Sequence, residues 1–208
     1  KVQAGTPLTR EDGYRLIKST NLPELGYMAD FVRRKKHGTK TYFTHSINVN
    51  YTNICVLTCK FCAFSRTKHE PDAYTWSVEE IVNKVRNAAK KGVWEVHIVG
   101  GLHPDKRMDY YEAMMRGIKE ACPGVLIQGF TAVELDLFAR QNKIPVREVL
   151  ERLKAAGLGG VPGGGAEIFA EKPRKEICGT KITGKQWLAV HQVAHEVGFR
   201  TNATRSRN

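Results

Sequence analysis

The sequence predicts an α/β fold, a partial TIM-like barrel that is truncated after about five strands and preceded by N-terminal helices. Two observations predict this architecture. Strand-like and helix-like segments alternate from about residue 42 onward, which favours parallel strands with helices outside them. The cysteine-rich and glycine-rich segments directly follow predicted strands. In such barrels the loops after the strands carry the chemistry, so both observations point to one architecture.

Two helices are expected before the barrel. The first covers Leu8–Thr20, and its candidate buried positions are Leu8, Tyr14, Leu16 and Ile17. The second covers Glu24–Lys36 and ends in basic residues before Gly38, a common helix stop. We therefore expect an N-terminal helical segment over residues 1–39 and a C-terminally incomplete barrel over residues 40–208.

The first strand of the barrel is expected within Tyr42–Tyr51. Apolar and polar residues alternate there, as they do in a strand with one buried face. The residues Ser77 and Glu80 form a capping-box pattern that opens a helix, which should end near Gly92. Its candidate buried residues are Ile81, Val85, Ala88 and Ala89.

Further strands and helices alternate along the rest of the chain. The remaining strands are expected at Val93–Val99, Val125–Phe130, Leu158–Val161 and Phe199–Ala203. The remaining helices are expected at Asp109–Cys122, Pro145–Ala156 and Thr183–Val197. An open set of five strands leaves unpaired edges, so we expect a truncated sequence whose tail, Arg205–Asn208, lies outside the barrel.

Composition excludes several classes of protein. No apolar run approaches the roughly 18 to 20 residues of a membrane span, and the N-terminus has no secretory core, so we expect a cytoplasmic protein without a membrane partner. The net charge is +12, but only residues 33–40 and 172–176 are densely charged. Neither run carries interleaved aromatic residues, so we expect no nucleic-acid partner. We expect the basic residues to lie on the solvated surface or to attract a small substrate that carries a carboxylate or phosphate.

The cysteines indicate a metal site instead of a disulfide framework. There are five, an odd number, and three of them lie within the eight residues from Cys55 to Cys62. A reducing compartment fits this distribution. The other two, Cys122 in a predicted helix and Cys178 in a predicted loop, are expected to be buried or incidental thiols.

The residues Cys55, Cys59 and Cys62 form a CxxxCxxC motif after the first predicted strand. Three thiolates on one loop suit three corners of a [4Fe–4S] cluster, which normally takes four thiolates, and so leave one iron open. The alternative is a zinc knuckle completed by His69 or another side chain. Zinc sites usually have two separated ligand pairs, and no second pair is present.

This motif resembles the hallmark of the radical S-adenosylmethionine superfamily, whose members share a TIM-like (βα)6 barrel. The resemblance implies that Cys55, Cys59 and Cys62 bind a [4Fe–4S] cluster and that S-adenosylmethionine chelates the open iron. One electron, from a donor such as flavodoxin or ferredoxin, then gives methionine and a 5′-deoxyadenosyl radical. By the same resemblance, Phe61 packs beside the adenine and Gly100–Gly101 approaches the methionine amino group.

Three further side chains are candidate site residues. Gln128 on the third strand and Glu167 after the fourth could hydrogen-bond the ribose or the substrate, or could be ordinary polar loop residues. His103 could be an acid–base group or a solvated turn histidine. Gly100–Gly101 and Phe61 also have purely structural interpretations. The glycine pair could form a tight turn, and Phe61 could be an aromatic residue of the core.

A closer resemblance, to the futalosine-pathway enzymes of menaquinone biosynthesis and within them to the aminodeoxyfutalosine synthase group, covers nearly the whole chain. The segments that carry it are Tyr51–Cys55, Cys62–Arg66, Val99–Pro104, Pro162–Phe169, Ala194–His195 and Thr201–Thr204. It implies that the radical adds to the dicarboxylate enol ether 3-[(1-carboxyvinyl)oxy]benzoate to give 6-amino-6-deoxyfutalosine. Arg66, near the cluster, is the expected basic group and His103 the expected acid–base group.

Other functions remain open at the level of sequence. Dehypoxanthine futalosine cyclase and the deazaflavin synthase subunits are similar to this chain in the same motifs. A zinc-binding module that contacts nucleic acid is the alternative from a different class. Colour separates these classes, because an iron–sulfur protein is brown and a zinc protein is colourless.

Overall fold

The computed structural model describes residues 1–204. The tail 205–208, which was expected to lie outside the barrel, lies outside the described residues. Contacts within the chain separate two compact units, Lys1–Phe43 and Thr44–Asn208. No helix within residues 1–204 has both the length and the apolar character needed to cross a membrane.

The N-terminal unit contains two helices, α1 (Arg10–Lys18) and α2 (Leu22–His37). Thr9 and Asp12 form a reciprocal capping box at the start of α1, and α2 ends at Gly38, as predicted. The expected burial on α1 is wrong, because neither helix has a buried residue and Ile17 is 67% exposed. Two short helices cover only part of each other's surface. The apolar face that the sequence pattern predicts for α1 is therefore not buried.

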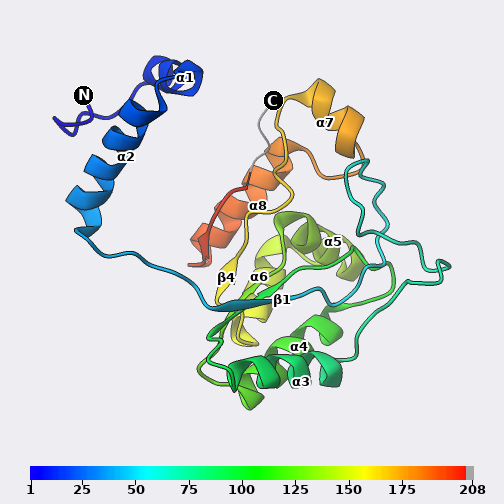
Figure 1. Cartoon of the computed structure of the whole chain (residues 1–208). Helices are drawn as coiled ribbons and strands as arrows, with labels where there is room; N and C mark the ends of the chain where they lie inside the picture. Colours follow the sequence, from blue (N-terminus) through cyan, green and yellow to red (C-terminus); the bar gives the residue numbers. More distant parts are fainter. Residues whose placement is uncertain (205–208) are drawn as a thin grey trace. The chain divides into compact units, whose positions relative to one another are not determined.

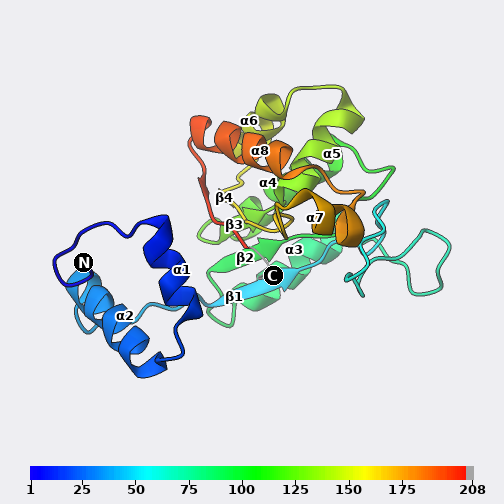
Figure 2. The same cartoon turned by 90° about the horizontal axis from the view of Figure 1, so that it is seen from above.

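Five short parallel strands form one sheet in the second unit, as predicted. They are β1 (Ser46–Val49), β2 (Glu95–Ile98), β3 (Leu126–Gly129), β4 (Gly160–Val161) and β5 (Arg200–Thr201). They lie side by side in chain order. Figure 1 shows the whole chain, and Figure 2, seen from above, shows β1, β2, β3 and β4 in this order. The first strand is shorter than expected, because Tyr42 and Phe43 pair with no strand and are exposed.

Helices connect these strands. They are α3 (Val78–Ala89), α4 (Met108–Ala121), α5 (Ala132–Asn142), α6 (Val146–Ala155), α7 (Glu171–Cys178) and α8 (Gly184–Glu196). Contacts run from α3 to α4, from α4 to α6 and from α6 to α8, while α5 packs on α6 and α8. Parallel strands in chain order with right-handed crossovers place their helices on one face of the sheet. Helices α3, α4, α5, α6 and α8 therefore form one layer.

Two helices were not predicted. Helix α5 is buried on nearly all sides, so its sequence lacks the polar face that marks an amphipathic helix. Helix α7 is rich in charges and has only two buried residues, Arg174 and Cys178. The prediction of a loop at Cys178 is therefore wrong, because this residue ends α7 and is 1% exposed.

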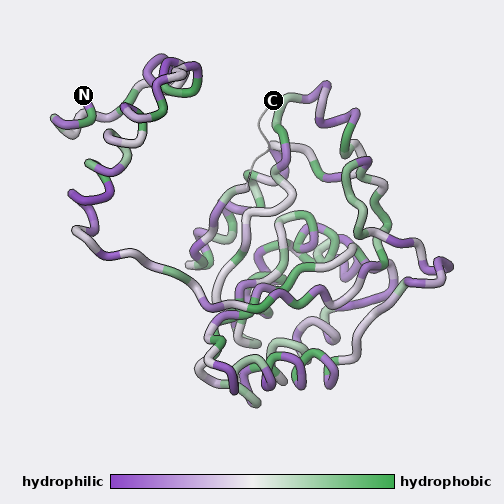
Figure 3. The backbone as a smooth tube through the Cα atoms, viewed as in Figure 1, coloured by the Kyte–Doolittle hydropathy of each residue, from purple (hydrophilic) through white to green (hydrophobic). Residues whose placement is uncertain are grey.

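The hydrophobic core lies between the sheet and the helix layer. Ser77 and Glu80 form the capping box that starts α3, and Ile81 and Val85 are fully buried as predicted. The tube in Figure 3 alternates green and purple along α3, which reflects this one-sided burial. Aromatic packing fills the centre of the core, where the rings of Tyr111 and Phe138 stack with centroids 3.8 Å apart.

A buried arginine organises the segment between β4 and α8. Arg174 is 6% exposed, and its guanidinium donates only to backbone carbonyls. The acceptors are the carbonyls of Gly165, Ala166, Ile168 and Ile182, at 2.5 to 3.2 Å. Each hydrogen bond satisfies a carbonyl that would otherwise be buried without a donor. Arg174 therefore joins the glycine-rich segment after β4 to α7 and to the start of α8.

We predict that Arg174→Met lowers the free energy of unfolding by about 3 kcal/mol, because it leaves several buried carbonyls without donors. Urea unfolding followed by circular dichroism measures the change. Lys175→Met, at the exposed neighbouring position on α7, is the matched control and should be nearly neutral. Equal stability of both variants would contradict this role for Arg174.

Candidate functional site

The cysteine loop follows β1 and is anchored by two long-range contacts. The backbone N–H of Val56 donates to the carbonyl of Leu102, at 3.1 Å, in the turn after β2. The N–H of Lys60 donates to the carbonyl of Ile177, at 2.9 Å, in α7. Segments that lie far apart in the sequence therefore hold the residues from Cys55 to Cys62.

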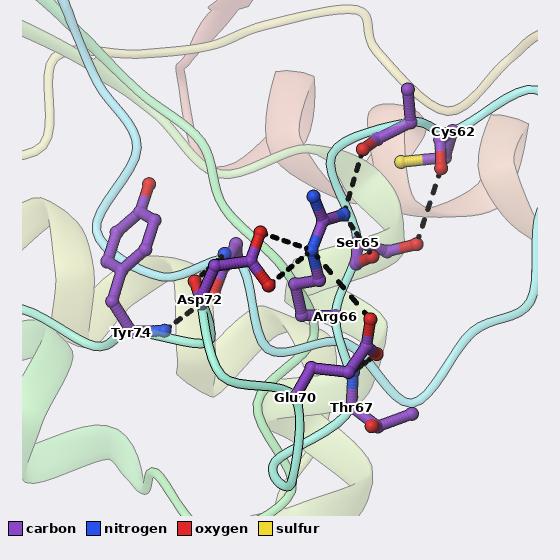
Figure 4. A network of polar contacts seen from close by, with 9 residues as sticks. Cys62, Ser65, Arg66, Thr67, Glu70, Asp72 and Tyr74 are labelled. Atoms are coloured by element: carbon purple, nitrogen blue, oxygen red, sulfur yellow. Dashed lines mark hydrogen bonds and ion pairs between the residues drawn. The ribbon is translucent and has the colours of Figure 1, made fainter.

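Arg66 stabilises the segment that follows Cys62 and leaves the cysteine loop, as Figure 4 shows. Its Nε lies 2.8 Å from Asp72 Oδ2, and its Nη1 donates to the carbonyls of Ala63 and Ser65 at 2.9 and 3.0 Å. Its backbone carbonyl accepts from the N–H of Cys55 at 2.9 Å. The structure thus places the guanidinium within its own loop, and Arg66 is not among the residues that line the neighbouring pocket.

The three cysteines of the motif line one pocket. All three thiols are free and partly exposed. The cavity has a volume of about 140 Å³. Six of the ten predicted site residues meet here, namely Cys55, Cys59, Cys62, Phe61, Gly100 and Gly101. The topology therefore brings the loop after β1 and the turn after β2 together, as parallel strands require.

The donor set fits a cuboidal cluster better than a single ion. His69, the fourth ligand in the zinc alternative, is not among the residues that line this pocket. A [4Fe–4S] cluster takes its thiolates on different iron atoms, so its ligands surround a volume. Three free thiols around one pocket match that requirement. Burial raises the pKa of the Cys59 thiol, and the nearby Lys181 ammonium opposes the rise.

The glycine pair packs directly against the chain that enters the cysteine loop. A Cβ atom on Gly101 would lie 2.2 Å from the carbonyl oxygen of Ile54, and one on Gly100 would lie 2.8 Å from the ring of Tyr51. The N–H of Gly101 donates to the carbonyl of Thr52 at 2.8 Å. Only glycine permits this approach. The pair thus sets the spacing between the two walls of the pocket.

A buried carboxylate, Glu134, supports the glycine pair. It is 1% exposed and lines the pocket. Its Oε1 accepts from Tyr51 Oη at 2.9 Å and from the N–H of Gly100 at 3.1 Å. Its Oε2 accepts from the N–H and the hydroxyl of Thr131, at 2.7 and 2.8 Å. Burial raises the pKa of Glu134 to about 7, although these hydrogen bonds oppose the rise.

A cation also lines the pocket. Lys181 Nζ lies 5.2 Å from the centroid of the Phe61 ring and 2.7 Å from Glu167 Oε1. Glu167 itself, which has a positive φ of 46°, does not line the cavity. The predicted site residue Glu167 therefore reaches the pocket only through Lys181, and Phe61 is half exposed at its edge.

The two remaining predicted residues lie away from the pocket lining. His103 is 7% exposed, and its Nδ1 accepts from the N–H of Asp105 at 3.1 Å, so the neutral ring carries its proton on Nε2. Burial lowers the pKa of His103, which favours this neutral form. Gln128 lies on β3, with its amide over Gly160 of β4.

Sequence reasoning missed Glu134 and Lys181. A signal for the first was present, because Thr131 and Glu134 have the spacing of a capping box and form one at the start of α5. That pattern would have placed a carboxylate in the first turn of a helix after β3. No sequence signal distinguished Lys181 from the other lysines near it.

The family follows from these features and from comparison with known proteins. A family model described as the radical SAM superfamily matches residues 49–206, which is most of the chain. The chain belongs to this superfamily. Members hold an iron–sulfur cluster and S-adenosylmethionine, which agrees with the motif, the free thiols and the glycine turn described above.

Comparison with curated proteins shows similarity to particular enzymes of the superfamily. The chain is 46% identical over 204 residues to the aminodeoxyfutalosine synthase of Thermus thermophilus, covering 98% of this chain and 55% of that protein. It is 36% identical over 208 residues to the cyclic dehypoxanthine futalosine synthase of Streptomyces coelicolor, covering 98% and 52%. The chain thus spans about half the length of the curated relatives it matches.

Solved structures support the fold. Methylornithine synthase is similar with a TM-score of 0.76 at 18% identity, covering 97% of this chain and 56% of that one. The FeFe-hydrogenase maturase HydG from Carboxydothermus hydrogenoformans gives 0.77 at 21% identity, covering 99% and 46%. At such low identities the similarity concerns the architecture alone.

We predict that Gly101→Ala reduces the iron content several-fold after anaerobic reconstitution, because its Cβ forces Ile54 and the adjoining Cys55 away. Iron analysis and absorbance near 400 nm measure the loss. Gly124→Ala, where a Cβ meets no atom within 4 Å, is the control and should reconstitute normally. Full iron loading of Gly101→Ala would contradict this role for the glycine.

The raised pKa of Glu134 predicts a specific pH dependence of stability. The folded state holds this proton more tightly than the unfolded state, so the contribution is complete below pH 4.5 and is lost as the pH rises through about 7. Over that window, wild type should lose up to about 3 kcal/mol relative to Glu134→Gln, which cannot titrate.

Urea unfolding at several pH values measures these slopes. The control is Glu151→Gln at an exposed position of α6, which should keep the wild-type slope. Parallel pH profiles for wild type and Glu134→Gln would refute the raised pKa.

Proposed function

We propose that this chain carries the catalytic barrel of a radical S-adenosylmethionine enzyme that forms 6-amino-6-deoxyfutalosine in menaquinone biosynthesis. The observation that carries the proposal is the meeting of the three free cysteine thiols and the Gly100–Gly101 turn in one pocket. The 46% identity to an aminodeoxyfutalosine synthase supports the particular reaction.

In this proposal Cys55, Cys59 and Cys62 hold the [4Fe–4S] cluster, and the backbone of Gly100–Gly101 accommodates S-adenosylmethionine. When bound, the two groups supply a 5′-deoxyadenosyl radical. Phe61, at the pocket edge, offers an apolar face to the adenine. Five free thiols and an oxygen-sensitive cluster are compatible with a reducing, cytoplasmic location and a donor such as flavodoxin or ferredoxin.

The overall reaction balances without a further oxidant. The C5′–S bond of S-adenosylmethionine breaks and methionine leaves, while a new bond joins C5′ to the methylene carbon of 3-[(1-carboxyvinyl)oxy]benzoate. The aryl ring moves from the ether oxygen to the carbon that bears the carboxyl group, so the aryl C–O bond breaks, an aryl C–C bond forms and the former ether oxygen becomes the ketone oxygen. The carboxyl carbon then departs as bicarbonate with consumption of one water and release of one proton. The electron that opens the sulfonium is recovered when this carbon leaves, so the adenosyl group is consumed and no net reductant is used.

The chain's own residues prepare the pocket for an anionic ligand. Lys181 is a partly buried cation in the lining, and within residues 1–204 its one carboxylate partner is Glu167. A carboxylate that enters the pocket meets this ammonium with little competing water, which strengthens the attraction. Glu134 and Arg66 act on the walls, because the first holds the glycine turn and the second holds the cysteine loop.

We predict that the reconstituted protein, given S-adenosylmethionine, reductant and the enol ether, consumes both substrates and forms a product with the mass of 6-amino-6-deoxyfutalosine. Mass spectrometry under anaerobic conditions measures it. The Cys59→Ser variant should lose activity by at least about 100-fold, because one corner of the cluster loses its thiolate. Cys122→Ser, away from the pocket, is the matched control and should remain active.

The relative at 36% identity, the cyclic dehypoxanthine futalosine synthase, defines the competing reaction. The same assay distinguishes the two, since a cyclase leaves the enol ether untouched and converts dehypoxanthine futalosine instead. Formation of the cyclised product alone would overturn the proposed reaction but leave the superfamily chemistry in place. A colourless, zinc-loaded protein would overturn both.

A further inference from the structure

One row of residues crosses the whole sheet. The strand registers pair Asn48 with His97, His97 with Gln128, Gln128 with Gly160, and Gly160 with Arg200. Residues paired in this way on parallel strands project from the same face. Four polar side chains and one glycine from five strands therefore line up across one face. We call this set the polar row.

The polar row lies on the face opposite the helices. On β2 the flanking residues Val96 and Ile98 are fully buried in the core, so His97 between them points the other way. At the far edge, Thr201 lies 2.8 Å from His195 of α8, so Thr201 faces the helix layer. Its neighbour Arg200 then projects from the opposite face, together with His97.

Polar groups of the row lack partners in the described part of the chain. His97 Nε2 is buried and has no hydrogen-bond partner there, which is uncommon for a buried ring nitrogen. Gln128 extends over β4, and a Cβ on Gly160 would lie 2.5 Å from its amide oxygen. Glycine at position 160 thus leaves room for an amide that makes no hydrogen bond within residues 1–204. Such unpaired groups indicate a ligand.

The charge of the row favours an anion. Arg200 is exposed, and within residues 1–204 it forms no ion pair. The next row on the same face, two register positions toward the N-terminal ends of the strands, contains one acidic residue, Glu95, which pairs with Ser46 and Leu126. The guanidinium, the amide and the imidazole N–H all donate hydrogen bonds, and a planar carboxylate accepts from such groups.

The row is at a suitable distance from the pocket. His97 on β2 precedes Gly100 in the following turn by three residues, which corresponds to about 10 Å of extended chain. A small molecule that lies on this face of the sheet with one end at the polar row therefore extends its other end toward the glycine turn and the cysteine pocket. This is the direction in which the reacting carbon of a substrate must point.

We infer that Arg200, Gln128 and His97 form the carboxylate-binding end of the substrate site. The inference deepens the proposed function and rests on it. The bound group is a carboxylate of a small, planar, aromatic enol-ether acid, held by Arg200 with Gln128 and His97 as flanking donors. None of them lines the cysteine pocket, so we assign them to positioning of the substrate.

The test is anaerobic titration calorimetry of the reconstituted protein with S-adenosylmethionine present. The probes are 3-[(1-carboxyvinyl)oxy]benzoate and its uncharged dimethyl ester. Arg200→Gln should weaken binding of the diacid about 10-fold to 100-fold, since it removes a charge-assisted contact. Arg200→Lys should restore part of the affinity. Binding of the diester should be weak for wild type and unchanged in Arg200→Gln.

Two controls separate this role from a general effect on folding or charge. Ser46→Ala alters the same face one register row away, and Lys90→Gln removes an exposed cation at the end of α3. Both should bind the diacid as wild type does. Formation of 5′-deoxyadenosine without substrate should be equal in wild type and Arg200→Gln, which shows that the cofactor pocket is intact.

The outcomes separate the two proposals. The polar row does not hold the substrate if the variants Arg200→Gln, Gln128→Leu and His97→Phe all bind the diacid as well as wild type does. The proposed function stands in that case. If wild type neither binds nor converts the diacid, the proposed function fails. If Arg200→Gln proves unstable in thermal unfolding, the Gln128→Leu and His97→Phe variants decide the question, each with a several-fold loss expected.

Discussion

The site depends on one close approach between two stretches of backbone. Gly101 lies against Ile54 so tightly that a single added carbon would come within 2.2 Å of a carbonyl oxygen. This contact places the turn after β2 beside the segment that leads into Cys55. Three thiols and a bare peptide surface thereby share one pocket. A substitution that widened this gap would separate the three cysteines from the glycine turn.

Two buried charged groups hold the rim of the same pocket. Glu134 fixes the glycine turn and the start of α5, while Arg174 fixes the segment after β4 through four carbonyls. Burying a charge is costly unless hydrogen bonds compensate for lost water. Arg174 bonds to backbone carbonyls, and Glu134 accepts from two backbone N–H groups and two hydroxyls. These residues therefore determine loop positions more than they add net stability. Their common effect is a rigid frame around loops that carry no regular structure.

Cations divide the proposed ligand-binding region into two ends. Lys181 lies beside the cysteine pocket, and Arg200 lies on the sheet face opposite the helices. The surplus of basic residues seen in the composition thus has local positions that suit small carboxylates. Most other lysines and arginines are exposed or pair with nearby acids. A few residues at defined positions determine the charge at the site. The net charge of the chain comes largely from residues on the surface.

The sequence alone determined the parallel α/β architecture, the five strands and the cysteine loop, because alternation, capping boxes and the CxxxCxxC spacing are local patterns that need no distant partner. It did not reveal α5 or α7, since one is buried nearly all around and the other has no apolar stripe. Only the tertiary structure decided that Arg66 braces its own loop, that Lys181 reaches the pocket and that His97, Gln128 and Arg200 align. Strand register and loop packing set these relations, and both depend on contacts between residues far apart in the chain.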